Sequence, residues 1–419
     1  MRHLRTAVRS GMRIALTLPL LASIGCAAAP PPTTASSARA CPTTEECQRR
    51  CDADDPTACY VLLVLADKGA ANADAAKSAA EKLGSLCDHR DGVACQLLGA
   101  AHAEGTSVPK NMAVAVAALA RACDLGRSAA CSGAGAALRA GAGSDRRRAR
   151  ELLERGCEGK DGASCSVLAN MERYGEAGPT NDERAVALYQ RGCDLGDPTG
   201  CANLATMYQT AESVPQDAAR AARLYEKACS GGLVLACTSL GVMLASGEAG
   251  SKDPTRAVTL LRRGCTADHA PACAYLATLL YQGEGTKKDV AEAVLLLRRT
   301  CDKNMTESCT LLGSILAQGK GVAADPKAAA EAFERACAER DWLACTGLAA
   351  LLMAGNGVDK DEDRALSLLI RACDANHADA CFRLGAAYTS QEQKDLAREM
   401  FEKACQLGDT RACQQSPSP

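Results

Sequence analysis

The stretch Ala122-Cys123-Asp124-Leu125-Gly126-Arg127-Ser128-Ala129-Ala130-Cys131 places two cysteines eight positions apart, with a glycine between them. The same spacing recurs ten more times, at Cys51 and Cys59, Cys87 and Cys95, Cys157 and Cys165, Cys193 and Cys201, Cys229 and Cys237, Cys265 and Cys273, Cys301 and Cys309, Cys337 and Cys345, Cys373 and Cys381, and Cys405 and Cys413. Most of these pairs follow one another at a step of 36 residues. A fixed period in this range is typical of solenoids, in which each repeat packs on its neighbours.

The composition argues against several classes of function. The 419 residues include 48 Lys and Arg against 50 Asp and Glu, which gives a formal net charge of −2, so we expect no nucleic-acid partner. Aromatic residues make up 3% of the chain, too few for a base-stacking platform or an aromatic ligand cage. The sequence therefore predicts one elongated, monomeric repeat domain with a core of Leu, Val, Ala and Cys.

The 25 cysteines indicate disulfides rather than metal sites. The chain contains no Cys-x-x-Cys pair, so we expect neither a metal nor another cofactor. Within one helix, residues eight apart lie about 12 Å apart along the axis, beyond the roughly 7 Å that a disulfide spans between α-carbons. Each pair is therefore expected to bridge two elements that fold back on each other.

The first 25 residues have the pattern of an export signal. Arginines between positions 2 and 13 precede a short apolar run at residues 14–24, too short to span a bilayer. Gly25-Cys26 follows directly, which resembles a bacterial lipoprotein cleavage point and predicts lipidation of Cys26. The alternative is ordinary secretion with cleavage at residues 27–29. Lipidation would anchor the chain to the outer membrane, in the periplasm or at the cell surface, with no other membrane contact.

The segment after the signal is expected to be a tether followed by a cap. Residues 26–40 are rich in Ala, Pro, Ser and Thr, and residues 41–58 carry Cys41 and Cys47. Without Cys26 the chain holds 24 cysteines, an even number, so Cys41–Cys47 is the twelfth expected disulfide beside the eleven pairs above. Pairings across repeats remain an open alternative.

The residues between two disulfide pairs predict two helices. From Cys273 to Cys301, residues 274–281 carry apolar side chains at helical spacing and stop at Gly283 and Gly285, and residues 290–299 form a second apolar face. The first cysteine of each pair is expected to end a second helix, and the second cysteine to open the next first helix. Ten such helix pairs make a solenoid over residues 59–413, before a tail at 414–419.

Columns of small residues support this division. Eight positions before the closing cysteine stands Ala in all ten units, and four positions after the opening cysteine stands Gly or Ala in nine. Leu occupies the position one residue earlier in nine of the ten units. Small side chains on facing helices let their backbones approach closely, so the two helices of each unit are expected to pack tightly.

Leu312-Gly313, Gly319-x-Gly321 and Ala329 together resemble the Sel-one-like repeat, a relative of the tetratricopeptide repeat. With the Cys-x7-Cys spacing, residues 51–413 are similar to the Hcp family of cysteine-rich secreted repeat proteins. The resemblance implies an all-α, right-handed α/α superhelix whose concave face, lined by first helices, binds a protein, a peptide or a cell-wall fragment. Some members of that family carry a penicillin-binding or weak β-lactamase label.

The residues give the hydrolase hypothesis little support. Ser107-Val108-Pro109-Lys110 matches the Ser-x-x-Lys string of serine β-lactamases, but it lies in a connection, and Ser-Asp-Asn and Lys-Thr-Gly are absent. We interpret the match as coincidence and predict no catalytic residue. The histidines also lie too far apart in the repeats for a zinc site; they are His3, His89, His102, His269 and His377.

Two further features have simple structural interpretations. Trp342 is the sole tryptophan and is expected to cover a helix end, although an interface anchor is the alternative. Arg146-Arg147-Arg148 is expected to be a solvated helix face. The leading hypothesis is an exported scaffold that binds a protein or an envelope polymer. A weak penicillin hydrolase and a purely structural spacer are the alternatives.

Overall fold

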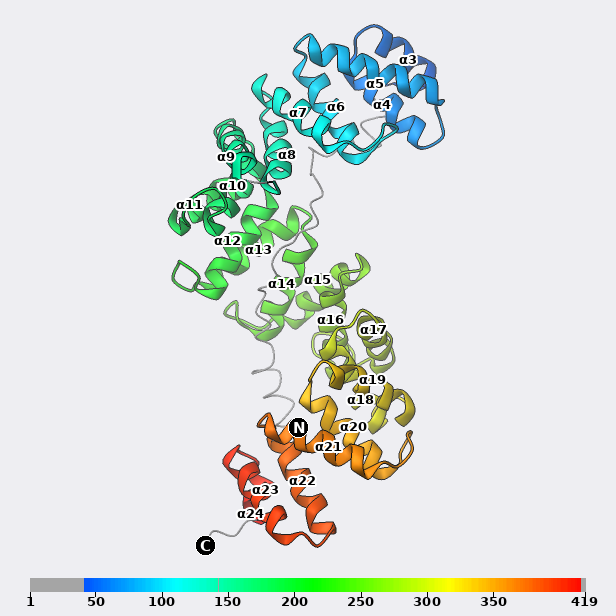
Figure 1. Ribbon diagram of the computed structural model, residues 1–419, viewed down its shortest axis with the longest axis vertical. Coiled ribbons are helices and arrows are strands. Elements are labelled where there is room, and N and C mark those ends of the chain that lie inside the picture. Colours follow the sequence, from blue (N-terminus) through cyan, green and yellow to red (C-terminus); the bar gives the residue numbers. More distant parts are fainter. Residues whose placement is uncertain (1–40, 142, 416–419) are drawn as a thin grey trace. The chain divides into compact units, whose positions relative to one another are not determined.

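The computed structural model describes residues 41–141 and 143–415, and this part of the chain folds into 22 helices without a β-strand (Figure 1). The predicted all-α solenoid, with Cys-x7-Cys disulfides at the repeat spacing, is confirmed. The signal segment, the tether and Cys26 lie outside the described residues. The chain divides into two compact units between Gly232 and Leu233.

The first unit contains a short N-terminal helix and five helical hairpins. Its helices are α3 (Thr44–Asp52), α4 (Pro56–Asp67), α5 (Ala73–Asp88), α6 (Gly92–Glu104), α7 (Met112–Asp124), α8 (Ser128–Arg139), α9 (Gly143–Glu158), α10 (Gly162–Tyr174), α11 (Asp182–Asp194), α12 (Pro198–Thr210) and α13 (Ala218–Ser230). Even-numbered helices from α4 are first helices of a repeat, and odd-numbered helices from α5 are second helices.

The second unit repeats the same hairpin five times and ends in a short helix. Its helices are α14 (Val234–Ser246), α15 (Pro254–Thr266), α16 (Ala270–Gln282), α17 (Val290–Asp302), α18 (Thr306–Gln318), α19 (Pro326–Ala338), α20 (Trp342–Ala354), α21 (Glu362–Asp374), α22 (Ala378–Ser390), α23 (Lys394–Gln406) and α24 (Thr410–Gln415).

Second helices begin at a capping residue that the sequence supplies in nearly every repeat. The side chain of Asp289 accepts a hydrogen bond from the backbone N–H of Glu292, and Asp325 does the same for Ala328. Such a cap satisfies one of the backbone donors that have no partner within the helix. The connection before each second helix therefore ends at a defined residue.

The two glycines of the Gly-x-Gly motif in the connection are needed for different reasons. Gly283 ends α16 with a φ of 75°, in the left-handed region that favours glycine. Gly285 lies so close to Pro254, the first residue of α15, that a β-carbon there would overlap the Pro254 backbone. Gly357 stands in the same relation to Pro326. The second glycine thus lets a connection pack on the second helix of the preceding repeat.

First helices begin earlier than the sequence predicted. Cys273 is the fourth residue of α16, which starts at Ala270, so the expectation that the second cysteine opens the helix is wrong by three residues. The start of the helix is fixed by the N-cap residue, four positions before the cysteine. This residue is Asp91 before α6 and Asp341 before α20, and both side chains accept backbone hydrogen bonds.

The small-residue column lies where the two helices of a repeat approach each other. A β-carbon added at Gly313 of α18 would stand 2.7 Å from Cδ1 of Phe333 on α19, and one at Gly241 of α14 would stand 2.9 Å from Cγ of Leu261 on α15. Phe333 and Leu261 are themselves buried. The two helices of the hairpin therefore pack closely because a large side chain of the second helix occupies the space that a β-carbon on the first helix would take.

Candidate functional site

The disulfides join the second helix of one repeat to the first helix of the next. Within the two units, the Cys-x7-Cys bonds have Cα–Cα distances between 4.5 and 4.9 Å. They link Cys51 with Cys59, Cys87 with Cys95, Cys123 with Cys131, Cys157 with Cys165, Cys193 with Cys201, Cys265 with Cys273, Cys301 with Cys309, Cys337 with Cys345, Cys373 with Cys381, and Cys405 with Cys413. Cysteines that follow one another along the chain are thus the ones that pair.

The remaining described cysteines lie at the start of the chain and at the ends of the two units. Cys41 and Cys47 are bonded across 5.2 Å at the start of α3. Cys229 belongs to α13 of the first unit and Cys237 to α14 of the second, and each is buried. Almost all described cysteines are buried in the same way, so they stabilise the joints between repeats and present no reactive thiol at the surface.

The Ser-x-x-Lys string of the hydrolase hypothesis lies in the connection between α6 and α7. The Ser107 hydroxyl donates a hydrogen bond of 2.8 Å to the carbonyl oxygen of Leu63, and Ser107 has a left-handed φ of 51°. Both features hold the connection against α4. A nucleophilic serine requires a base beside its hydroxyl, whereas this hydroxyl is engaged by a backbone carbonyl. The described residues give the hydrolase hypothesis no support.

The described histidines make local contacts in separate repeats. Nδ1 of His102 lies 3.2 Å from the carbonyl oxygen of Pro109, and Nδ1 of His89 lies 2.8 Å from that of Ser85. Among residues 41–141 and 143–415, no group of three or more His, Cys, Asp or Glu side chains could hold a metal ion. No helix in this part of the chain is long and apolar enough to cross a membrane.

His269 and His377 occupy the N-cap positions of α16 and α22 without capping them. Nδ1 of His269 lies 3.0 Å from Oγ1 of Thr238 on α14. Burial lowers the pKa of both imidazoles below the ordinary value of 6.5, and at His377 the carboxylates of Asp379 and Asp341 oppose that shift in part. Both rings therefore favour the neutral form. The Thr238 hydroxyl donates to the carbonyl oxygen of Val234 at 3.1 Å, so its oxygen can accept a hydrogen bond from Nδ1 of His269.

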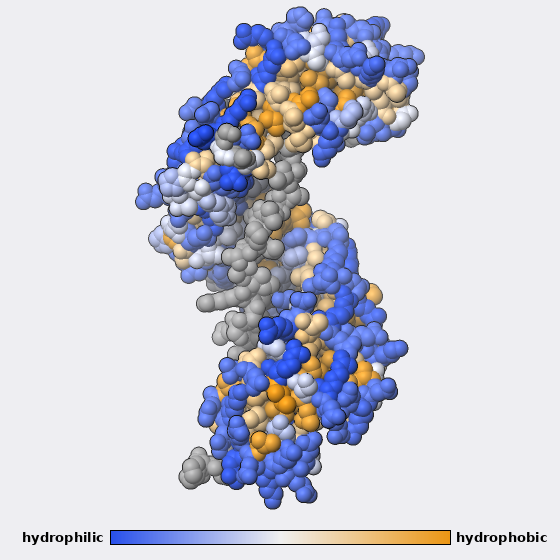
Figure 2. Space-filling view, in the orientation of Figure 1, coloured by the Kyte–Doolittle hydropathy of each residue, from blue (hydrophilic) through white to orange (hydrophobic). Residues whose placement is uncertain are grey.

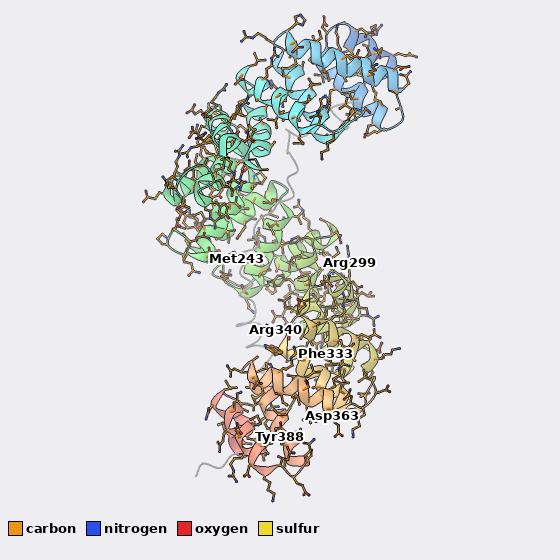
Figure 3. The ribbon with its side chains drawn as sticks, in the orientation of Figure 1. Met243, Arg299, Phe333, Arg340, Asp363 and Tyr388 are labelled. Carbon is orange, nitrogen blue, oxygen red and sulfur yellow. A yellow bond between two sulfur atoms is a disulfide. The ribbon has the colours of Figure 1, made fainter. Side chains whose placement is uncertain are left out.

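Trp342 is the first residue of α20, and its ring is partly exposed. The guanidinium of Arg340, which Figure 3 labels at the preceding turn, lies 5.7 Å from the ring centroid. The structure thus places Trp342 at a helix start with a cation beside it. Arg146, Arg147 and Arg148 are exposed in the first turns of α9.

Aromatic side chains divide between the two kinds of helix. The four on second helices stand four positions before a closing cysteine and are buried, at exposed fractions of 0% for Tyr189, 2% for Tyr225, 4% for Phe333 and 8% for Phe401. The partly or fully exposed ones all lie on first helices: Tyr174, Tyr275, Tyr281, Trp342, Phe382 and Tyr388. Tyr174 is 56% exposed. The first helices thus carry the aromatic surface of the described chain.

Apolar side chains other than aromatic ones reach the surface on both kinds of helix, and Leu295 of second helix α17 is 68% exposed. Figure 2 shows hydrophobic residues gathered over the α4–α7 region of the first unit and over the α20–α22 region of the second, on a surface that is otherwise mostly hydrophilic. In the first region, Val64 and Leu65 of α4 and Leu97 of α6 are partly buried side chains that pack on the core. In the second, Leu343 of α20 is 48% exposed.

A second kind of surface lies between consecutive second helices. In several repeats, the polar side chain three positions before the closing cysteine of one second helix forms a hydrogen bond across to the next second helix. Its partner there stands nine positions before the closing cysteine of that helix. These bridging pairs are Glu154 with Arg184 at 2.7 Å, Gln190 with Arg220 at 3.2 Å, Arg262 with Glu292 at 2.6 Å and Glu334 with Arg364 at 2.7 Å. Each pair spans the groove that its two second helices form above the intervening first helix.

The groove between α17 and α19 has no bridging pair. The two bridging positions hold Arg298 and Ala328, and Arg298 makes a long ion pair of 3.9 Å with Asp325 instead. A cavity of about 190 Å³ opens there, floored by Leu312 and Leu316 of α18. We call this cavity and its lining residues the α17/α19 groove. Figure 3 labels Arg299 and Phe333 on its two bordering helices.

The other charged residues of the α17/α19 groove differ in how they are held. The Arg335 guanidinium donates to Asp302 at 2.8 Å and to the carbonyl oxygen of Cys301 at 2.6 Å, which neutralises Asp302. Glu331 lies one turn along α19 from Ala328 and is exposed. The groove thus presents Arg298 from α17 and Glu331 from α19 beside the floor of Leu312 and Leu316.

The equivalent groove between α9 and α11 is filled by charge. Its floor holds Glu172 of α10, 4% exposed, at the position that Leu316 occupies in α18. The Glu172 carboxylate lies 2.8 Å from the Arg150 guanidinium and 3.4 Å from that of Arg184. Two cations thus surround one buried carboxylate, as a buried charge requires.

Sequence analysis did not find the bridging pairs or the α17/α19 groove. Part of the signal was available in the sequence, because opposite charges stand three and nine positions before successive closing cysteines at Glu154 and Arg184, Arg262 and Glu292, and Glu334 and Arg364. Arg298 and Ala328 are among the positions that depart from this pattern. Recognising it requires the register of second helices against each other, which the cysteine spacing alone does not supply.

Nine segments of the chain match the Sel1 repeat. They cover residues 92–126, 128–161, 163–197, 198–233, 234–269, 270–305, 306–341, 342–377 and 378–409. The hairpin of α4 and α5 precedes these segments, and it carries Leu63 where most repeats have a small residue.

Solved structures with the same repeat share the architecture. A protective antigen of uropathogenic Escherichia coli with an SLR fold is 23% identical with a TM-score of 0.72, over 80% of this chain and 73% of that one. A Sel1 repeat protein of Oxalobacter formigenes is 23% identical with a TM-score of 0.54, over 71% of this chain and 88% of that one. At these identities the likeness shows the fold alone. No curated protein matches the chain.

Proposed function

The chain belongs to the Sel1 repeat family, and from this we propose that it is an exported scaffold that binds a partner protein through the exposed surface of its first helices, which we propose line the concave face. Sel1-repeat proteins generally bind other proteins. The observation that carries the proposal is the division of aromatic residues, since those on second helices are buried while the exposed ones lie on first helices. Tyr and Trp are enriched at the energetic centres of protein interfaces.

Export is supported by the number of disulfides. Such a number of paired cysteines suggests an oxidising, exported environment, because cytosolic reductants keep thiols reduced. We extend this to anchoring at Cys26, which would place residues 26–40 as a tether between a lipid and the repeats.

Site-specific cross-linking tests the binding surface. A photoreactive phenylalanine analogue at Tyr174, exposed on first helix α10, is compared with the same analogue at Val114, which is 37% exposed on second helix α7. We expect a discrete cross-linked partner in the native host from position 174 and none from position 114. Equal products from both positions, or none from position 174, would contradict the proposed surface.

Lipidation is tested separately by Cys26→Ala. We expect the unaltered chain to fractionate with membranes and its N-terminal peptide to carry the mass of a diacylglyceryl modification, and the variant to lose both. If mass spectrometry of the unaltered chain instead finds an unmodified N-terminus at residues 27–29, ordinary secretion replaces the lipoprotein hypothesis.

A further inference from the structure

We propose that the α17/α19 groove is a second binding surface, which takes a partner-protein segment with an aliphatic side chain between an acidic and a basic residue. In this segment the aliphatic side chain enters the cavity, the carboxylate faces Arg298 and the amine faces Glu331. The inference goes beyond the first-helix surface. It rests on the proposed function only in requiring a protein partner.

The neighbouring groove shows where a carboxylate belongs. Between α15 and α17, Arg262 stands three positions before its closing cysteine and donates to Glu292 at 2.6 and 3.1 Å. Arg298 occupies the corresponding position on α17, but Ala328 stands where Glu292 would correspond. The α17/α19 groove therefore has the arginine of a bridging pair and lacks the carboxylate, which a partner can supply.

The floor of the groove favours an aliphatic side chain. Leu312 and Leu316 line it together with Ala328 and Ala332, and the cavity measures about 190 Å³. One water occupies about 30 Å³ of the liquid, so the space accommodates a leucine or isoleucine side chain. Transfer of an aliphatic side chain from water onto Leu312, Leu316, Ala328 and Ala332 is favourable, because it removes apolar surface from water.

Charge sets the composition of the segment. Arg335 and Asp302 neutralise each other, so Arg298 and Glu331 are the charges that remain to be complemented. Arg298 is 51% exposed and its ion pair with Asp325 is long, which leaves its guanidinium open to a closer carboxylate. A basic and an acidic side chain beside one apolar floor favour a segment that carries an acidic and a basic residue next to an aliphatic one.

The probe is the fluorescein-labelled peptide Ser-Glu-Leu-Lys-Ser, amidated at its C-terminus, followed by fluorescence anisotropy with the full oxidised chain. We expect saturable binding that weakens when its Glu becomes Gln or its Leu becomes Ala. Ala328→Glu recreates the paired arrangement of Arg262 and Glu292 inside the groove. We expect it to weaken peptide binding at least tenfold, about 1.4 kcal/mol, without lowering the thermal unfolding midpoint.

Two further variants control this result. Arg298→Gln removes the cation and should weaken binding of the Glu peptide but not of its Gln analogue. Glu292→Ala removes a charge from the adjacent groove and should leave the affinity for the peptide at least as high. Binding that Ala328→Glu leaves unchanged, or no saturation up to about 1 mM peptide, overturns the proposal. A normal cross-link from position 174 in that case leaves the first-helix surface standing.

Discussion

At the scale of single residues, His269 occupies a position that other repeats give to a capping aspartate. Asp91, Asp161 and Asp341 accept backbone hydrogen bonds there, whereas His269 makes no capping bond to α16. In the repeat of α18, the Thr310 hydroxyl donates to Asp341 at 3.0 Å, so an aspartate is compatible with a threonine at the position of Thr238.

His269→Asp is therefore expected to stabilise the protein. A good N-cap contributes about 0.5–2 kcal/mol relative to a residue that does not cap. Chemical denaturation of the oxidised chain at pH 7.5 should show a raised midpoint, while His269→Ala, which removes the ring without adding a cap, should not. A midpoint for His269→Asp at or below that of the unaltered chain would contradict the capping argument.

The same two histidines predict a pH dependence of stability. Burial lowers the pKa of His269 and His377 in the folded state below the ordinary 6.5, so the unfolded chain binds more protons as the pH falls. Their contribution to stability is present above about pH 6.5 and is lost as the pH decreases through that value towards the folded pKa.

We expect the unfolding midpoint to decrease as the pH is lowered from about 7.5 to about 5.5. The slope of the midpoint against pH should be shallower in the double variant His269→Gln/His377→Gln. If the double variant and the unaltered chain have parallel pH profiles, these imidazoles do not supply the dependence.

Residue identity did not predict the backbone of the disulfide turns. Three positions after each closing cysteine the chain adopts a left-handed conformation, which Gly126 and Gly196 favour. Arg90, Lys160 and Arg340 take the same conformation, with φ of 71°, 64° and 64°. Nothing in a basic side chain signals positive φ, so the disulfide and the two helix ends impose it.

At the scale of helices, the small-residue column is the feature that the sequence predicted best, because it has a direct steric cause. Gly and Ala at a fixed distance from the opening cysteine predicted that the two helices approach closely. The Phe333 ring indeed occupies the space beside Gly313 where a β-carbon would stand. The groove between α17 and α19 could not be predicted in the same way. It depends on which side chains of two helices, some thirty residues apart, face each other.

Gly313→Ala should therefore destabilise its hairpin. The added β-carbon would stand 2.7 Å from the Phe333 ring, and overpacking of this kind costs about 1–3 kcal/mol. Gly84 in α5 is the matched control, since a β-carbon there meets nothing within 4 Å. Gly84→Ala should raise stability by about 0.5–1 kcal/mol. Thermal denaturation of both variants checks the contrast; equal effects would refute it.

At the scale of the whole molecule, each disulfide belongs to one joint in a chain of similar joints. Cys301 and Cys309 connect α17 to α18 and close a loop of about nine residues, for which chain entropy gives about 2.6 kcal/mol. Because repeats interact with their neighbours only, loss of one bond should loosen that joint more than distant ones.

Hydrogen exchange of the double variant Cys301→Ser/Cys309→Ser tests this locality. We expect faster exchange in α17 and α18 and unchanged exchange in α21 and α22 of the same unit. Cys41→Ser/Cys47→Ser, at the start of the described chain, should leave all four helices unchanged. Uniformly faster exchange in the first variant would instead indicate that the repeats unfold as a single cooperative body.

The short sequence separation of the bonded cysteines also governs how the protein can mature. Each Cys-x7-Cys bond needs only two residues that follow one another closely on the polypeptide, in a turn whose flanking helices are local as well. Oxidation can therefore proceed in the order in which the repeats emerge during synthesis or translocation. A newly exposed cysteine meets its own partner before those of later repeats exist, which limits the demand for disulfide isomerisation.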